Sequence, residues 1–144
     1  QGWVGSYVHG GKIGVLVEVN CETDFVARTE QFQNLVRDLC LQIASMGPRY
    51  VSREDVPPEE ISLALEALHE NMGEVDDEAA PSIQQSYLEK FYKELVLLDQ
   101  PFIKDPSKTV QDLIHDAVAG LRENIVVRRF TRMVLGQALP GNTT

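Results

Sequence analysis

The sequence has 144 residues and a formal net charge of −9, from 22 acidic and 13 basic side chains. A chain of this length can bury about two thirds of its unfolded surface in one core, so we expect a single folded domain. The acidic balance argues against direct nucleic-acid binding, which requires a concentrated basic face. No apolar run approaches the roughly 20 residues needed to span a bilayer, so we expect a soluble protein without membrane contact.

Two features bear on the cellular compartment. The first residue is Gln1 rather than Met and no positively charged signal segment opens the chain. We expect that a leader or an upstream domain has been removed, either by the cell or in preparing the protein. Cys21 and Cys40 lie at apolar positions of a predicted strand and a predicted helix, so they are interpreted as small hydrophobic residues and not as a disulfide framework. A reducing compartment is therefore expected.

The chain opens with two predicted strands. Residues 3–9 alternate between apolar and polar side chains, and Gly10-Gly11 can adopt the positive φ angles of a tight turn. From residue 13 a second period of two places one apolar set on a buried face, namely Ile13, Val15, Val17, Val19 and Cys21. We expect a β-hairpin.

A corner between strand and helix follows at residues 23–27. Thr23 and Asp24 are residue types that bond to nearby backbone N–H groups and begin helices. Thr29, followed by Glu30 and Gln31, predicts the start of a longer helix with an apolar stripe from Phe32 to Ile43. Gly47-Pro48 predicts its end.

The middle of the chain predicts two helices. Pro57-Pro58 begins the first, and the second begins at about Pro81, with an acidic break at residues 73–80 between them. We expect these helices to form a helical hairpin at 58–98, inserted in a domain that spans 1–144. The stretch 54–78 contains ten carboxylates and no Lys or Arg. It is interpreted as a solvated face, with docking of a basic partner as the alternative.

The last third predicts an extended segment, a helix and a strand. Residues 97–105 are expected to be extended, and Asp105-Pro106 to cap a helix that ends at Asn124. Residues 125–135 are rich in β-branched side chains and predict the last strand. Two strands, several helices and a strand without βαβ alternation indicate an α+β fold, with a small three-stranded antiparallel sheet packed against helices in two layers.

Candidate chemistry is sparse. Glu18, Glu22 and Asp24 are the nearest approach to a carboxylate pair for acid/base work, but no His, Lys or nucleophile lies near them in the sequence. The three histidines are scattered and have no zinc-site spacing, so neither a metal nor a cofactor is expected. Gly10-Gly11 lacks the remaining residues of a phosphate loop.

Phe25 has two interpretations. It precedes Phe32 by seven positions and could be the first core residue of the helix stripe. Alternatively, the corner presents an acid and an aromatic side chain, Asp24 and Phe25, to another protein as an interface hot spot. Composition and periodicity leave both interpretations open.

Residues 18–28 resemble the signature of elongation factor Ts, the exchange factor of the GTPase elongation factor Tu. Three further stretches resemble the family in the same order, at 2–9, 98–105 and 123–130. The resemblance extends through nearly the whole chain. It implies a guanine-nucleotide exchange factor of translation elongation that is not an enzyme, or, as an alternative, a docking and dimerisation module of the same fold without exchange activity.

The resemblance also implies which residues act. The family's Thr-Asp-Phe-Val element falls on Thr23, Asp24, Phe25 and Val26, which are expected to enter elongation factor Tu beside its nucleotide and to displace the groups that hold Mg²⁺. The single copy of the core resembles the short form of the family and implies a homodimer. The chain is expected to begin after the family's N-terminal helical domain. A location in the cytoplasm, or in the stroma or matrix of an organelle, is also implied.

Overall fold

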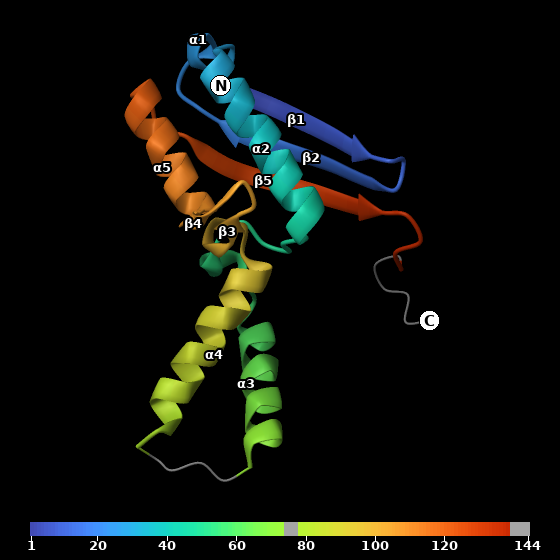
Figure 1. Cartoon of the computed structure of the whole chain (residues 1–144), viewed down its shortest axis with the longest axis vertical. Coiled ribbons are helices and arrows are strands. Elements are labelled where there is room, and N and C mark those ends of the chain that lie inside the picture. Colours follow the sequence, from blue (N-terminus) through green and yellow to red (C-terminus); the bar gives the residue numbers. More distant parts are fainter. Residues whose placement is uncertain (74–77, 139–144) are drawn as a thin grey trace. The chain divides into compact units, whose positions relative to one another are not determined.

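The computed structural model describes residues 1–73 and 78–138 (Figure 1). The chain forms two compact units, one made of Gln1–Gly47 together with the chain from Gln111 onward, the other of Pro48–Val110. Among the described residues no helix is both long enough and apolar enough to cross a membrane. The α+β fold class is confirmed, with a three-stranded antiparallel sheet and helices packed against it.

The sheet of the first unit has the order β1-β2-β5. Strand β1 (Gly2–His9) pairs with β2 (Ile13–Asn20) through the predicted hairpin, and β2 pairs on its other side with β5 (Val126–Val134). Gly10 and Gly11 have φ angles of 57° and 68°, as the tight turn requires. All three predicted strands are confirmed.

Helix α2 (Glu30–Met46) lies against one face of this sheet (Figure 1). Its N-terminal cap is Thr29, whose hydroxyl accepts from the Phe32 N–H, and Gly47 ends it in the left-handed region at φ 58°. The core between helix and sheet comes from the predicted apolar sets, including Val15, Val17 and Val19 of β2 and Phe32, Leu39 and Ile43 of α2. The opposite face of the sheet is not covered by α2.

The second unit contains a helical hairpin and a small sheet. Helices α3 (Pro58–Met72) and α4 (Ala80–Leu95) pack side by side (Figure 1), although Ala64 is their only buried residue among those described. The acidic break predicted between them falls partly at residues 74–77, outside the described residues. The larger prediction, one domain at 1–144 with an insertion at 58–98, stays a prediction.

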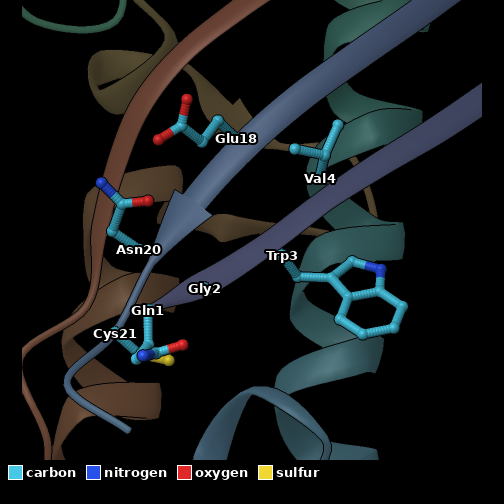
Figure 2. Close-up of a pocket in the computed structure, with 7 residues that line it drawn as sticks. All are labelled: Gln1, Gly2, Trp3, Val4, Glu18, Asn20 and Cys21. Carbon is cyan, nitrogen blue, oxygen red and sulfur yellow. The ribbon is translucent and has the colours of Figure 1, made fainter. Parts of the chain in front are cut away.

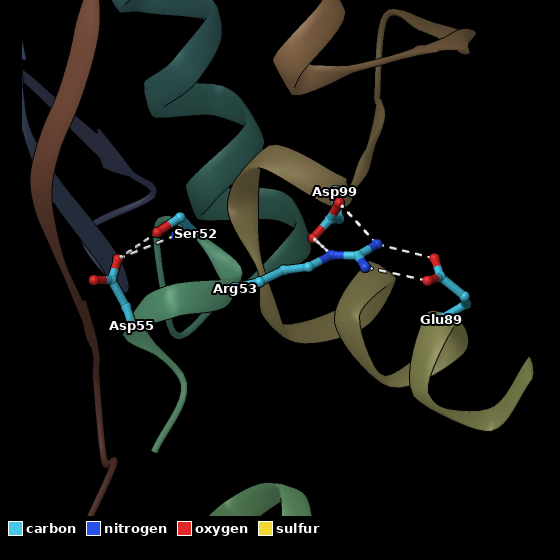
Figure 3. A network of polar contacts seen from close by, with 5 residues as sticks. All are labelled: Ser52, Arg53, Asp55, Glu89 and Asp99. Atoms are coloured by element: carbon cyan, nitrogen blue, oxygen red, sulfur yellow. Dashed lines mark hydrogen bonds and ion pairs between the residues drawn. The ribbon is translucent and has the colours of Figure 1, made fainter. Parts of the chain in front are cut away.

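An ion-pair network ties the hairpin to the short segments beside it. Arg53 lies in the 3₁₀ turn η1 (Arg53–Asp55) and pairs with Glu89 of α4 and Asp99 of the turn η2 (Leu97–Asp99), each at 2.9 Å (Figure 3). Its guanidinium also lies 4.5 Å from the ring centroid of Tyr92. The hydrogen bonds from Arg53 lower the pKa of Glu89. The network is partly exposed and therefore orients these segments more than it stabilises them.

Two predictions for residues 97–110 are wrong. Asp105-Pro106 does not cap a helix: it begins strand β4 (Asp105–Thr109), which pairs with β3 (Pro101–Phe102), and helix α5 (Val110–Leu121) begins only afterwards. The Asp105 carboxylate accepts instead from the N–H and hydroxyl of Ser107. The expected extended segment at 97–105 likewise includes the 3₁₀ turn η2.

Candidate functional site

The corner after β2 is a capped turn in the first unit. Its helix α1 (Asp24–Ala27) has only four residues, and Thr23 caps it by accepting the Val26 N–H at 3.2 Å. The Cys21 thiol donates to the Thr23 carbonyl at 3.2 Å, and the Thr29 hydroxyl donates to the Val26 carbonyl at 2.7 Å. The predicted start of a helix at Thr23 and Asp24 is confirmed.

Neighbouring residues of this turn differ sharply in exposure. Phe25 is 82% exposed, while Val26 and Ala27 are 6% and 0% exposed and anchor the turn to the core. The interpretation of Phe25 as the first core residue of the α2 stripe is therefore wrong, and the buried stripe begins at Phe32. An exposed aromatic ring beside buried anchors can enter a pocket on another molecule.

Asp24 contributes a charge beside the ring. Its carboxylate pairs with Arg28 at 2.8 Å, four residues along the chain, and both side chains are more than half exposed. An exposed pair of this kind adds little stability, so either partner can exchange it for an interaction with another molecule at small cost.

The carboxylate of Glu123 accepts hydrogen bonds from the corner, although Glu123 lies 100 positions after Thr23 in the sequence. Oε1 of Glu123 accepts the N–H groups of Glu22 and Thr23 at 3.1 and 3.0 Å, and its Oε2 accepts the Thr23 hydroxyl at 2.7 Å. In return the Glu22 carboxylate accepts the Asn124 N–H at 3.2 Å. We call these four hydrogen bonds the carboxylate clamp.

The chain's relatives place it in a family. A sequence profile described as "Elongation factor TS" matches residues 1–137. An elongation factor Ts of Caldanaerobacter subterraneus subsp. tengcongensis is 50% identical over 96% of this chain and 71% of its own length. One from Coprothermobacter proteolyticus is 53% identical over 95% of this chain and 71% of its own, and one from Moorella thermoacetica is 51% identical over 96% and 70%. The chain belongs to the elongation factor Ts family. Elongation factor Ts is the nucleotide exchange factor of elongation factor Tu and carries out no catalytic chemistry.

Other polar groups have structural partners. Glu18 and Glu22 are the candidate carboxylate pair for acid/base work. Glu18 forms an ion pair at 2.8 Å with Arg129 on the neighbouring strand, and Glu22 belongs to the carboxylate clamp. A shallow concavity of about 620 Å³ beside Glu18 (Figure 2) is lined by seven residues, namely Gln1, Gly2, Trp3, Val4, Glu18, Asn20 and Cys21. Within the described part of the chain, no group of three or more His, Cys, Asp or Glu side chains could hold a metal ion.

The cysteines are free and buried, as predicted. Burial raises the pKa of the Cys40 thiol from 9.0 to about 11, and burial is also the main cause that raises the pKa of Cys21. Both thiols are therefore protonated at neutral pH and unreactive as nucleophiles.

Glu123 is the functional candidate that sequence reasoning missed. It lies 100 positions from Thr23, and no local pattern connects two residues so far apart. The stretch that contains Glu123 resembles elongation factor Ts, but the resemblance marks it as the start of a strand and assigns it no partner. Only the pairing of β2 with β5 brings it beside the turn.

Proposed function

We propose that the Thr23–Val26 turn is the part of this chain that acts on GDP-bound elongation factor Tu, with Phe25 and Asp24 displacing the groups that hold Mg²⁺ beside the nucleotide. The observation that carries the proposal is the exposed ring of Phe25 on a turn whose neighbours are buried. Such a ring reaches a pocket on a partner without any rearrangement of this chain.

Loss of the cation accounts for faster exchange. Mg²⁺ bound to the GDP phosphates is the largest positive charge in such a site, and its departure leaves the phosphates poorly neutralised. The nucleotide then dissociates faster, and no covalent bond is made or broken. The Asp24 carboxylate lies next to Phe25 and adds negative charge where Mg²⁺ and the phosphates interact.

The mechanism requires negative coupling between two ligands of elongation factor Tu. If this chain weakens the binding of GDP by some factor, GDP weakens the binding of this chain by the same factor. Couplings of this type are usually ~1–3 kcal/mol, or about 5- to 150-fold in affinity. New nucleotide therefore releases the exchange factor.

Stopped-flow release of a fluorescent GDP analogue from elongation factor Tu tests the proposal. We expect this chain to accelerate release, Phe25→Ala to remove most of the acceleration, and millimolar Mg²⁺ to oppose it. Leu63→Ala, which truncates an apolar side chain 63% exposed in α3, is the matched control and should keep the wild-type rate. Wild-type acceleration by a folded Phe25→Ala would contradict the proposal. No acceleration by wild-type chain that is demonstrably bound would leave a docking and dimerisation module.

We also propose that the chain forms a homodimer through the face of the sheet that α2 leaves uncovered. The support is apolar surface on that face, contributed by Val4, Val8, Leu16 and Met133, each at least 49% exposed. A second copy would bury both sets of side chains at once, because a two-fold interface brings the same patch together. Light scattering should give twice the 16.1 kDa chain mass, and Leu16→Lys should reduce it to one chain. A single-chain mass for the wild type at micromolar concentration would refute the dimer.

Two coarser expectations accompany these proposals. We propose that residues 1–144 form one core domain with a helical hairpin inserted at 58–98, which limited proteolysis would contradict by releasing a stable fragment. We also propose that the protein works in a bacterial cytoplasm, or in the stroma or matrix of an organelle. The support is its similarity to bacterial elongation factors, and cell fractionation is the test.

A further inference from the structure

We propose that Glu123 is a positioning residue that keeps the Thr23–Val26 turn in the shape that presents Phe25. The inference rests on the proposed function, because it assigns Glu123 an effect on exchange through Phe25 and not through its own contact with elongation factor Tu.

The carboxylate clamp leaves the corner little freedom. Both oxygens of Glu123 are used, one by the N–H groups of Glu22 and Thr23 and the other by the Thr23 hydroxyl. The Glu22 carboxylate accepts the Asn124 N–H, so hydrogen bonds run in both directions between the chain after β2 and the chain before β5. Hydrogen bonds to a carboxylate are stronger and shorter than those between neutral groups, which favours one arrangement of the corner.

The Thr23 hydroxyl connects Glu123 to the helix cap. A hydroxyl has one hydrogen and two lone pairs, and here the hydrogen points to Oε2 of Glu123. The lone pairs are then free to accept the N–H of Val26, the residue directly after Phe25. Loss of Glu123 would release the hydroxyl hydrogen and both backbone N–H groups to water, and would loosen the cap that sets the direction of the Phe25 side chain.

The backbone before Glu123 explains how this residue reaches the corner. Arg122 has a φ of 60°, the only positive φ of a non-glycine residue among those described. Its N–H ends α5 by donating to the Val118 carbonyl at 2.8 Å, and the chain then turns so that the next residue faces the corner. A residue in the left-handed region directly after a helix is a common way for the helix to end, and here it directs the chain toward the corner.

A double-mutant cycle on GDP release tests the inference, with each chain at saturating concentration. We expect Glu123→Ala to slow release about tenfold, since a small displacement of a contacting group has large effects on rate. Glu123→Gln keeps an oxygen that can accept both backbone N–H groups and should retain a rate within about threefold of wild type. In a Phe25→Ala background, Glu123→Ala should have no further effect. Glu66→Ala, an exposed residue of α3 with the same change in charge, is the matched control.

The outcomes separate this inference from the proposed function. If Phe25→Ala slows release and Glu123→Ala does not, the inference fails while the proposed function stands. If Phe25→Ala keeps the wild-type rate, the proposed function fails and the inference with it. Equal slowing by Glu123→Ala in both backgrounds would indicate direct contact with elongation factor Tu and would also overturn it. Hydrogen exchange of the Thr23 and Val26 amides gives a second readout, and unchanged protection in Glu123→Ala would contradict the inference even if release were slower.

Discussion

Truncation of two phenylalanines seven positions apart should have opposite consequences. Phe25→Ala is expected to leave the free energy of unfolding nearly unchanged and to remove nucleotide exchange. Phe32→Ala is expected to destabilise the fold. Both substitutions remove the same atoms from the same segment of chain, so their difference reports only the surroundings of the two rings.

The expected magnitudes follow from exposure. Phe25 is 82% exposed and loses almost no buried contact on truncation, so we expect a change within about 0.5 kcal/mol, as for other surface substitutions. Phe32 of α2 is 0% exposed in the core between the helix and the sheet, and truncation of a buried Phe usually costs about 3–5 kcal/mol. A typical domain has a free energy of unfolding of only about 5–15 kcal/mol. Phe32→Ala should therefore shift the unfolding midpoint far more than Phe25→Ala does.

Urea unfolding followed by far-ultraviolet circular dichroism measures both effects, and the fluorescence of Trp3, the only tryptophan in the sequence, gives a second probe. The same preparations then enter the GDP-release assay. A loss above about 2 kcal/mol in Phe25→Ala would refute the exposed position of the ring, because only a buried side chain has that effect. Loss of exchange without loss of stability would separate the role of Phe25 from folding.

Three further expectations concern the packing, the capping and the buried thiol of α2. Gly5→Ala would place a Cβ 2.2 Å from a methyl carbon of Val36, so it should cost about 1–3 kcal/mol by overpacking, while Gly14→Ala, with no atom within 4 Å, should be nearly neutral in the same urea titration. Thr29→Ala removes the α2 cap and should cost about 1 kcal/mol by thermal unfolding, whereas a neutral result would mean that water replaces the cap. The raised pKa of Cys40 favours the folded state below pH 9.0, and this contribution to stability is lost as pH rises toward about 11. Cys40→Ala should therefore flatten the decline in stability at alkaline pH. An identical decline in the variant and the wild type would contradict this expectation.

The sequence predicted those parts of the fold that local chemistry determines. A period of two gave β2, a helical period gave α2, and Thr29 and Gly47 marked the ends of that helix to within a residue. Each of these signals lies inside the element that it predicts. Together they establish the sheet and the helix beneath it, from which the corner at Thr23 follows.

The errors arose where two local structures compete. Asp105 can cap a helix, but it can equally accept hydrogen bonds from the residue two positions later, and in the folded chain it binds Ser107. Helix α5 therefore begins only at Val110, after the short β3–β4 pair. Nothing near Asp105 in the sequence decides between the two uses of its side chain.

The candidate site was predicted only in part, because exposure and long-range pairing are not local properties. Hydrophobic spacing alone placed Phe25 either in the core or on the surface, and burial of its neighbours Val26 and Ala27 is what leaves it outside. The link between Thr23 and Glu123 depends on which strands become neighbours in the sheet. The resemblance to elongation factor Ts named the turn without describing what holds it.

A helix of four residues is too short to be stable alone, so the shape of the turn depends on its surroundings. Val26 and Ala27 are buried and fix the turn against the core. The Gln33 side chain donates to the Ala27 carbonyl at 2.7 Å, and the carboxylate clamp fixes the backbone at Thr23. A turn that is already ordered loses little conformational entropy on binding. Under the proposed function, the interaction energy of the exposed Phe25 ring would then be available to weaken the binding of Mg²⁺ and nucleotide in elongation factor Tu. A flexible turn with the same residues would lose more conformational entropy on binding. Less of the interaction energy would remain to weaken nucleotide binding, so we would expect slower GDP release at equal contact area.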